Sequence, residues 1–192
     1  NISLNTITTL GSSSSGVTLT SNSLANYLSQ NTIVARSAGG ISIVSSNSNV
    51  LYTNTINSTD EGISVNASTN STQERNTIRT TASAAPGIRV INTRDTNFIQ
   101  NNTFITNGTN SPGIFLDTVN NTNISLNTIN TSQMNSSGII LSVTFRISVF
   151  GNTITTNHTN ASGIEMASSN RSNITSNVVK VIGNTSYANH LS

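Results

Sequence analysis

The sequence predicts an all-β protein, a right-handed three-sheet parallel β-helix of about seven to eight coils with 22 to 26 residues each. The first observation is a glycine followed by alternating apolar residues, which recurs at this period along the chain. The second is an asparagine that opens a short strand 14 or 15 residues after each such glycine. A self-similar period of this length is typical of a solenoid. We therefore expect one β-helix domain over residues 1–192, uncapped at both ends.

The first strand of each coil follows the glycine. Its apolar residues alternate with period two, as in Gly40-Ile41-Ser42-Ile43, which suits a strand and excludes an amphipathic helix. The glycine indicates a backbone conformation or a close approach that a β-carbon would obstruct. The copies begin at Gly16, Gly40, Gly62, Gly87, Gly113, Gly138 and Gly163.

The second strand opens with the asparagine. A carboxamide carries both a donor and an acceptor, so asparagines stacked one coil apart can hydrogen-bond along the axis. We predict such a ladder; the alternative is that asparagine only tolerates turn conformations there. The ladder residues are Asn5, Asn31, Asn54, Asn76, Asn102, Asn127, Asn152 and Asn177. The apolar residues two positions later should form one interior file: Ile7, Ile33, Ile56, Ile78, Phe104, Ile129, Ile154 and Val179.

A third short strand precedes each asparagine. Three strands per coil, separated by Ser, Thr, Asn and Gly turns, fit a triangular section in which each strand pairs with its equivalents above and below. This strand is least regular at Gln73, Glu74 and Arg75. Its apolar residues are Ile2 and Leu4, Leu28, Leu51, Ile99, Ile124 and Leu126, Val149, and Ile174.

Composition narrows the classes of partner. With 33% hydrophobic and 4% aromatic residues, the chain cannot fill a thick globular core, but a solenoid needs only a narrow apolar channel. A net charge of +2 gives little support for a nucleic-acid partner. There is no cysteine, and no apolar run approaches the roughly 20 residues of a transmembrane helix. We expect no cofactor, no metal and no membrane span.

Fifteen Asn-X-Ser/Thr motifs indicate an extracellular surface protein that carries glycans. The alternative is that the motifs are a by-product of a composition with 32 Asn and 62 Ser and Thr. The candidate glycosylation sites are Asn57, Asn66, Asn70, Asn107, Asn120, Asn135, Asn157, Asn160 and Asn184.

Together, the Gly-Ile and Asn-Thr-Ile motifs resemble the right-handed parallel β-helix repeats of the pectate-lyase-like superfamily, including the Asn- and Gly-Ile-rich versions of secreted and surface proteins. The resemblance runs from Asn1 to Val179 and implies the fold. It leaves the function open, because the same coil serves lyases, hydrolases, adhesins and inert stalks.

The resemblance implies that an enzyme of this fold would need clustered carboxylates, either paired for acid/base catalysis or bound to calcium. The acidic residues of this chain occupy different template positions, and no two of them form a column. His158 and His190 stand more than one coil apart. We therefore expect no enzymatic activity. The acidic residues are Asp60, Glu61, Glu74, Asp95, Asp117 and Glu165.

Two outward-facing features remain. Phe115 and Ile140 are expected side by side on one sheet, as a lateral contact or a sugar-stacking platform, unless a neighbouring turn covers them. Arg146 and Arg171 share a template position above Asp95 and Asn121, which indicates a solvated face; the alternative is a small polar stripe.

The leading functional hypothesis is a structural extracellular β-helix, a subunit or segment of a fibre, stalk or sheath. The alternative is a polysaccharide-binding or polysaccharide-processing module, such as an adhesin or a lyase-like protein. The expected partner is a second copy stacked head to tail, or flanking coils of a longer chain, with glycans bound or attached. The assembly residues are Asn1, Ile2, Leu4, Leu19, Met166 and Leu191.

Overall fold

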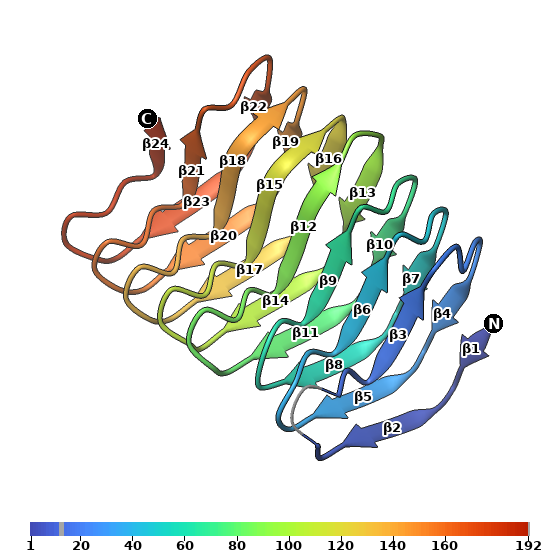
Figure 1. Ribbon diagram of the computed structural model, residues 1–192. Coiled ribbons are helices and arrows are strands. Elements are labelled where there is room, and N and C mark those ends of the chain that lie inside the picture. The colour runs from blue at the N-terminus through green and yellow to red at the C-terminus, as the bar shows by residue number, and fades with distance from the viewer. Residues whose placement is uncertain (12–13, 192) are drawn as a thin grey trace.

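The chain winds into a parallel β-helix, and the fold prediction is confirmed (Figure 1). The structure, a computed structural model, describes residues 1–11 and 14–191, with the Leu191 side chain outside the description. These residues form 24 strands in three parallel sheets and about seven turns of the solenoid. Within the same ranges no helix is long and apolar enough to cross a membrane.

Each coil contributes one strand to each sheet. Sheet A contains β1 (Ile2–Ser3), β4 (Tyr27–Ser29), β7 (Val50–Tyr52), β10 (Thr72–Glu74), β13 (Asn97–Gln100), β16 (Thr122–Ser125), β19 (Ser148–Phe150) and β22 (Asn173–Thr175). Sheet B contains β2 (Thr6–Thr9), β5 (Thr32–Ala35), β8 (Thr55–Ser58), β11 (Thr77–Thr80), β14 (Thr103–Thr106), β17 (Thr128–Thr131), β20 (Thr153–Thr156) and β23 (Val178–Val181). Sheet C contains β3 (Val17–Thr20), β6 (Ile41–Val44), β9 (Ile63–Asn66), β12 (Ile88–Thr93), β15 (Ile114–Asn120), β18 (Ile139–Phe145), β21 (Ile164–Ala167) and β24 (Asn189–Leu191).

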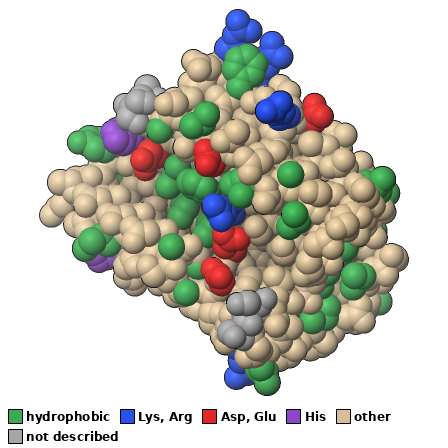
Figure 2. Space-filling view, in the orientation of Figure 1, with side chains coloured by type: hydrophobic (Ala, Val, Ile, Leu, Met, Phe, Trp, Pro, Cys, Tyr) green, Lys and Arg blue, Asp and Glu red, His purple; other side chains and the backbone are tan. Residues whose placement is uncertain are grey.

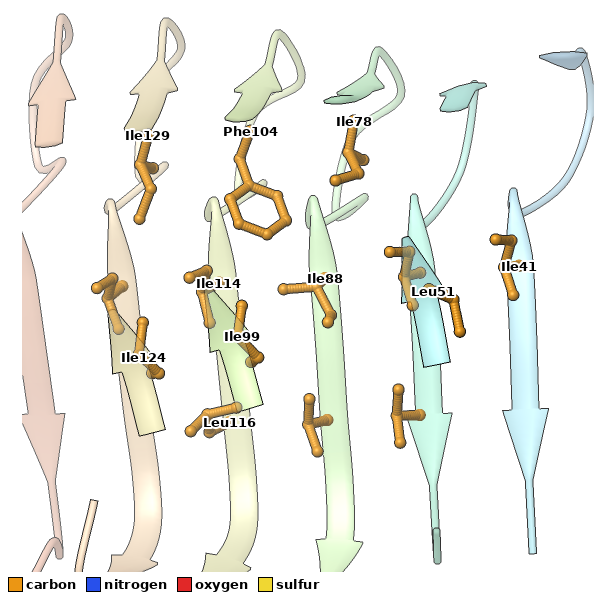
Figure 3. Close-up of a cluster of buried hydrophobic side chains, with 14 of the residues drawn as sticks. Ile41, Leu51, Ile78, Ile88, Ile99, Phe104, Ile114, Leu116, Ile124 and Ile129 are labelled. Carbon is orange, nitrogen blue, oxygen red and sulfur yellow. The ribbon is translucent and has the colours of Figure 1, made fainter. Parts of the chain in front are cut away.

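Equivalent residues pair in register from coil to coil, so the core consists of files that run along the axis. Ile78 pairs with Ile56 on one side and with Phe104 on the other. Ile78, Phe104 and Ile129 lie in successive coils and point into the channel, beside a second file that contains Ile88 and Ile114 (Figure 3). Buried branched side chains, stacked in this way, supply the hydrophobic stabilisation that a thick core supplies in a globular protein.

The recurrent glycine is required by close approach of the chain. A β-carbon on Gly87 would lie 2.7 Å from Cδ1 of Phe104 and 2.6 Å from the carbonyl oxygen of Gly113 in the next coil. Real β-carbons do not approach other atoms so closely. The glycine therefore lets the start of sheet C pack directly against the sheet B file.

The corner between sheets A and B corrects one expectation. Leu4 and Leu126, which the sequence placed in the third strand, lie just outside β1 and β16 and are 76% and 54% exposed. Both have positive φ, 59° and 56°, and both follow the last residue of a sheet A strand. The left-handed corner turns the chain from sheet A to sheet B and directs these side chains outward, whereas Ile2 and Ile124 of the same strands face the core.

The irregular third strand, β10, still pairs with its neighbours in sheet A. Strand β10 pairs in register with β7 and β13, and Gln73 takes the inward position between Leu51 and Ile99. Gln73 is fully buried, and neither its amide nitrogen nor its amide oxygen has a hydrogen-bond partner. A polar side chain therefore interrupts the apolar channel at this coil.

Candidate functional site

The eight ladder asparagines lie in one file at the start of the sheet B strands. The Oδ1 of Asn102 accepts the Nδ2 and the backbone N–H of Asn76, at 3.0 and 2.9 Å. The Nδ2 of Asn102 donates in turn to Oδ1 of Asn127 at 3.1 Å and to the carbonyl oxygen of Gln73 at 2.8 Å. Each interior member is therefore satisfied by both neighbouring coils, and the file is a structural element.

The glycosylation candidates fall on the turns and outward strand faces. Six of them are exposed, namely Asn57, Asn70, Asn135, Asn157, Asn160 and Asn184. The other three are half-buried, namely Asn66, Asn107 and Asn120. Exposure permits attachment at the first group, and glycosylation of this chain stays a prediction.

The assembly candidates lie near the two ends of the coil stack. Leu19 is buried in β3, and Met166 pairs in register with the backbone of Leu191, whose side chain is outside the described part. Ile2 is half-buried in β1, and Asn1 is exposed. Leu4 points outward at its corner and does not belong to the interior files. Head-to-tail stacking stays a prediction.

A groove lies over the outer face of sheet C. It has a volume of about 630 Å³. On this face, hydrophobic side chains gather in a hollow near the centre of the view, beside acidic and basic side chains (Figure 2). The groove is lined by Glu61, Ala84, Pro86, Arg89, Asn110, Pro112, Phe115, Asn135, Ser137, Ile140, Asn160 and Glu165.

The floor of the groove is the outward file of sheet C. Arg89 pairs with Phe115, Phe115 with Ile140, and Ile140 with Glu165. Phe115 and Ile140 are thus side by side, as the sequence predicted, and both are half-buried. Neighbouring turns flank them without covering them, which leaves an apolar floor in the middle of the groove.

Charged groups stand at both ends of this floor. Nη1 of Arg89 lies 3.0 Å from Oε1 of Glu61, and its guanidinium carbon lies 6.0 Å from the Phe115 ring centroid. At the other end, Ser137 Oγ donates to Oε2 of Glu165 at 3.2 Å. The ion pair fixes Arg89 along the floor, and the hydroxyl orients the carboxylate of Glu165.

One wall of the groove consists of carboxamides from successive turns. Asn110, Asn135 and Asn160 are exposed and have positive φ values of 54°, 57° and 55°, so the same left-handed turn presents each of them. Nδ2 of Asn135 donates to Oδ1 of Asn110 at 3.0 Å. The wall therefore offers a row of amide donors and acceptors parallel to the axis.

Sequence reasoning identified the floor of this site but missed its walls. The sequence predicts Glu61 only as one of six scattered acidic residues, and Asn135 and Asn160 only as glycan acceptors. The available signal was the constant distance of 25 residues between Asn110, Asn135 and Asn160, which places them in one file. The turns that raise them beside the floor are visible only in the structure.

The two histidines lie in different elements of the fold. His158 lies in a turn, where its Nδ1 accepts the backbone N–H of Thr159 at 2.9 Å. His190 lies opposite Glu165 on sheet C and stacks on Tyr187, with ring centroids 5.3 Å apart. The described ranges contain no group of three or more His, Asp or Glu side chains that could hold a metal ion.

Comparison with known proteins agrees with the architecture. No curated protein and no solved structure matches the chain. The model of a protein family described as periplasmic copper-binding protein (NosD) matches residues 1–112. This match covers more than half of the 192 residues, and the family is one of right-handed parallel β-helices. The chain therefore belongs to the NosD family.

Proposed function

We propose that this protein is a non-catalytic β-helix of the cell envelope that binds an extended carbohydrate in the groove over sheet C. The family description is periplasmic, which is consistent with an envelope location. The observation that carries the proposal is the apolar pair Phe115 and Ile140, set between the polar ends Arg89 and Glu165 in a groove of about 630 Å³.

The chemistry of the groove matches the two sides of a sugar. A pyranose ring has an apolar face of C–H groups and a rim of hydroxyls. The apolar face can stack on Phe115 and Ile140, while the carboxamides, Arg89 and Glu165 supply donors and acceptors for the rim. Arg89 and Glu165 are three coil steps apart, about 14 Å at the sheet spacing, which suits an oligosaccharide better than a single sugar.

The spacing of the carboxylates supports a role in binding rather than hydrolysis. Glycosidases place two carboxyl groups about 5 to 9.5 Å apart across the scissile bond. The two glutamates of the groove, Glu61 and Glu165, belong to coils four steps apart, about 19 Å at the sheet spacing. Glu61 is also engaged by Arg89. We assign no catalytic residue.

Copper, which the family description names, does not fit the described residues. Copper prefers imidazole, thiolate and thioether ligands. The chain has no cysteine, and the described residues contain no group of three or more His, Asp or Glu side chains that could hold a metal ion. Copper therefore has no role in the function proposed here.

A structural role as part of a longer stack is the second candidate. It is favoured by the continuous sheet C file that runs in register from Leu19 through Val90 and Leu116 to Met166. Because each coil presents the same backbone pattern, further coils could pair by the same rule. Electron microscopy of the purified chain tests this candidate: filaments support it, and dispersed particles at all concentrations contradict it.

A glycan array probed with the labelled chain tests carbohydrate binding. We expect binding to extended glycans, at least tenfold weaker in Phe115→Ala, which corresponds to about 1.4 kcal/mol or more. Phe150→Ala is the matched control, because Phe150 is a 45% exposed aromatic on sheet A, away from the groove. Equal binding by Phe115→Ala and the wild type would exclude the groove. Release of new sugar ends from a bound glycan would instead show an enzyme.

A further inference from the structure

A second surface, at the corner between sheets C and A, combines two arginines with one aromatic ring. Two arginines, Arg146 and Arg171, occupy equivalent positions in adjacent coils, because the backbone N–H of Arg146 donates to the carbonyl oxygen of Asn170 at 3.0 Å. Phe145, which precedes Arg146 in the chain, lies beside both of them. The space-filling view shows a gathering of basic side chains about a hydrophobic one at an upper corner of the molecule (Figure 2).

Both guanidinium groups contact the same aromatic ring. The guanidinium carbon of Arg146 lies 4.8 Å from the Phe145 ring centroid, and that of Arg171 lies 5.4 Å from it. Each contact is a cation–π interaction. The ring is half-buried and therefore holds both cations in a defined place, although like charges in adjacent coils repel each other.

No acidic side chain neutralises this pair. The ion pairs of the described residues are Arg75–Glu74 and Arg89–Glu61, so neither arginine of the corner takes part in one. The strand pairing assigns Asp95 to no position in the file of Arg146 and Arg171. The turn from Thr93 to Asn97 is one residue longer than the turn from Val119 to Thr122, so Asp95 has no single equivalent in the next coil.

We infer that Arg146, Arg171 and Phe145 form a binding site for a phosphoryl group. Two guanidinium forks placed over one ring present several N–H donors that have no partner of their own in the described chain. A tetrahedral phosphoryl group has three acceptor oxygens and can accept from both forks at once, whereas a carboxylate matches a single fork. The bound anion also removes the repulsion between the two cations.

The phosphoryl group can be part of a soluble phosphate ester or of a phospholipid headgroup, and the experiment separates these sources. The full chain is titrated with inorganic phosphate and with glucose 6-phosphate, with glucose as the uncharged control. The side-chain NMR signals of Arg146, Arg171 and Phe145 report binding. In parallel, the chain is floated with phosphatidylcholine vesicles that contain phosphatidylglycerol and with vesicles of phosphatidylcholine alone.

The variant Arg146→Gln/Arg171→Gln should bind at least about tenfold more weakly, because it loses charge-assisted hydrogen bonds. The control Arg79→Gln/Lys180→Gln changes the net charge equally at two exposed residues of sheet B, on β11 and β23, and should bind like the wild type. Thermal unfolding verifies that all variants fold. Selective binding of the soluble phosphates identifies a phosphate ester, and binding only to the anionic vesicles identifies a lipid headgroup. Failure of every phosphate probe to bind, or equal weakening in both variants, overturns the inference.

Discussion

Asn127 and Asn152 are joined by two hydrogen bonds to a single oxygen. Oδ1 of Asn152 accepts the Nδ2 of Asn127 and its backbone N–H, both at 2.9 Å. The same Nδ2 also donates to the carbonyl oxygen of Ile99 at 2.8 Å. One carboxamide therefore satisfies backbone and side-chain groups of two coils in a buried corner, which explains why the position is asparagine in every coil.

Removal of one ladder member should destabilise the fold. In Asn127→Ala the backbone N–H of Asn102 and the carbonyl of Ile99 lose their buried partner, so we expect a loss of about 1–3 kcal/mol in the free energy of unfolding. Urea unfolding measures this loss. Asn130→Ala, on the exposed face of the same strand, is the control and should change little. Equal stability of the two variants would mean that the ladder only reflects turn preference.

The outermost described member of the ladder should be less sensitive. Asn5 is exposed and donates its Nδ2 to Oδ1 of Asn31 at 3.1 Å, with no coil below it in the structure. Because exposed groups can exchange protein partners for water, Asn5→Ala should lose well under half of the stability that Asn127→Ala loses. The same urea experiment decides this, and an equal loss at both positions would contradict it.

The coil glycine should not tolerate a methyl group. Gly87→Ala places a β-carbon against Phe104 and the carbonyl of Gly113, and over-packing of this kind costs about 1–3 kcal/mol or more. Gly11→Ala is the control, because the closest atom to its β-carbon would be Ser14 Oγ at 3.2 Å. Thermal unfolding of the two variants compares them directly. An unchanged unfolding temperature in Gly87→Ala would contradict this prediction and show that sheets B and C can move apart at this point.

An apolar residue at the irregular coil should stabilise the protein. Gln73 is buried with both amide atoms unpaired, between Leu51 and Ile99. Gln73→Leu removes the desolvation penalty and continues the apolar file, for a gain of about 1–3 kcal/mol. Gln100→Leu, on the outward face of β13, is the control and should be close to neutral. Urea unfolding with no gain for Gln73→Leu would indicate that the amide is satisfied by water.

Copper should leave the stability unchanged. A ligand that binds only the folded state stabilises it by RT ln(1 + [L]/Kd), so the unfolding midpoint keeps rising with ligand concentration above Kd. Because the described residues contain no group of three or more His, Asp or Glu side chains that could hold a metal ion, we expect no shift on addition of Cu²⁺ to the wild type, and the same result for His158→Ala and His190→Ala. An upward shift that grows with the Cu²⁺ concentration and disappears in either variant would contradict the assignment.

The sequence by itself determined the solenoid, the coil period, the interior files and the asparagine ladder. These features repeat, and in-register parallel pairing places each residue next to its own equivalent, so position in the template decides contact. Ile78 beside Phe104 and Asn102 beside Asn127 follow from counting residues. The outward pair Phe115 and Ile140 follows by the same rule.

Only the tertiary structure decided what lies between the files. Left-handed corners turn Leu4 and Leu126 outward, although their sequence pattern is that of interior residues. Turns raise Asn110 and Asn135 into a wall beside the sheet C floor, and Glu61 reaches across a coil boundary to Arg89. The physical reason is that the repeat constrains the side chains that pack in the channel. The direction of an outward side chain depends instead on the backbone dihedrals of the corner and on the length of the turn. The apolar period of the sequence encodes neither of these.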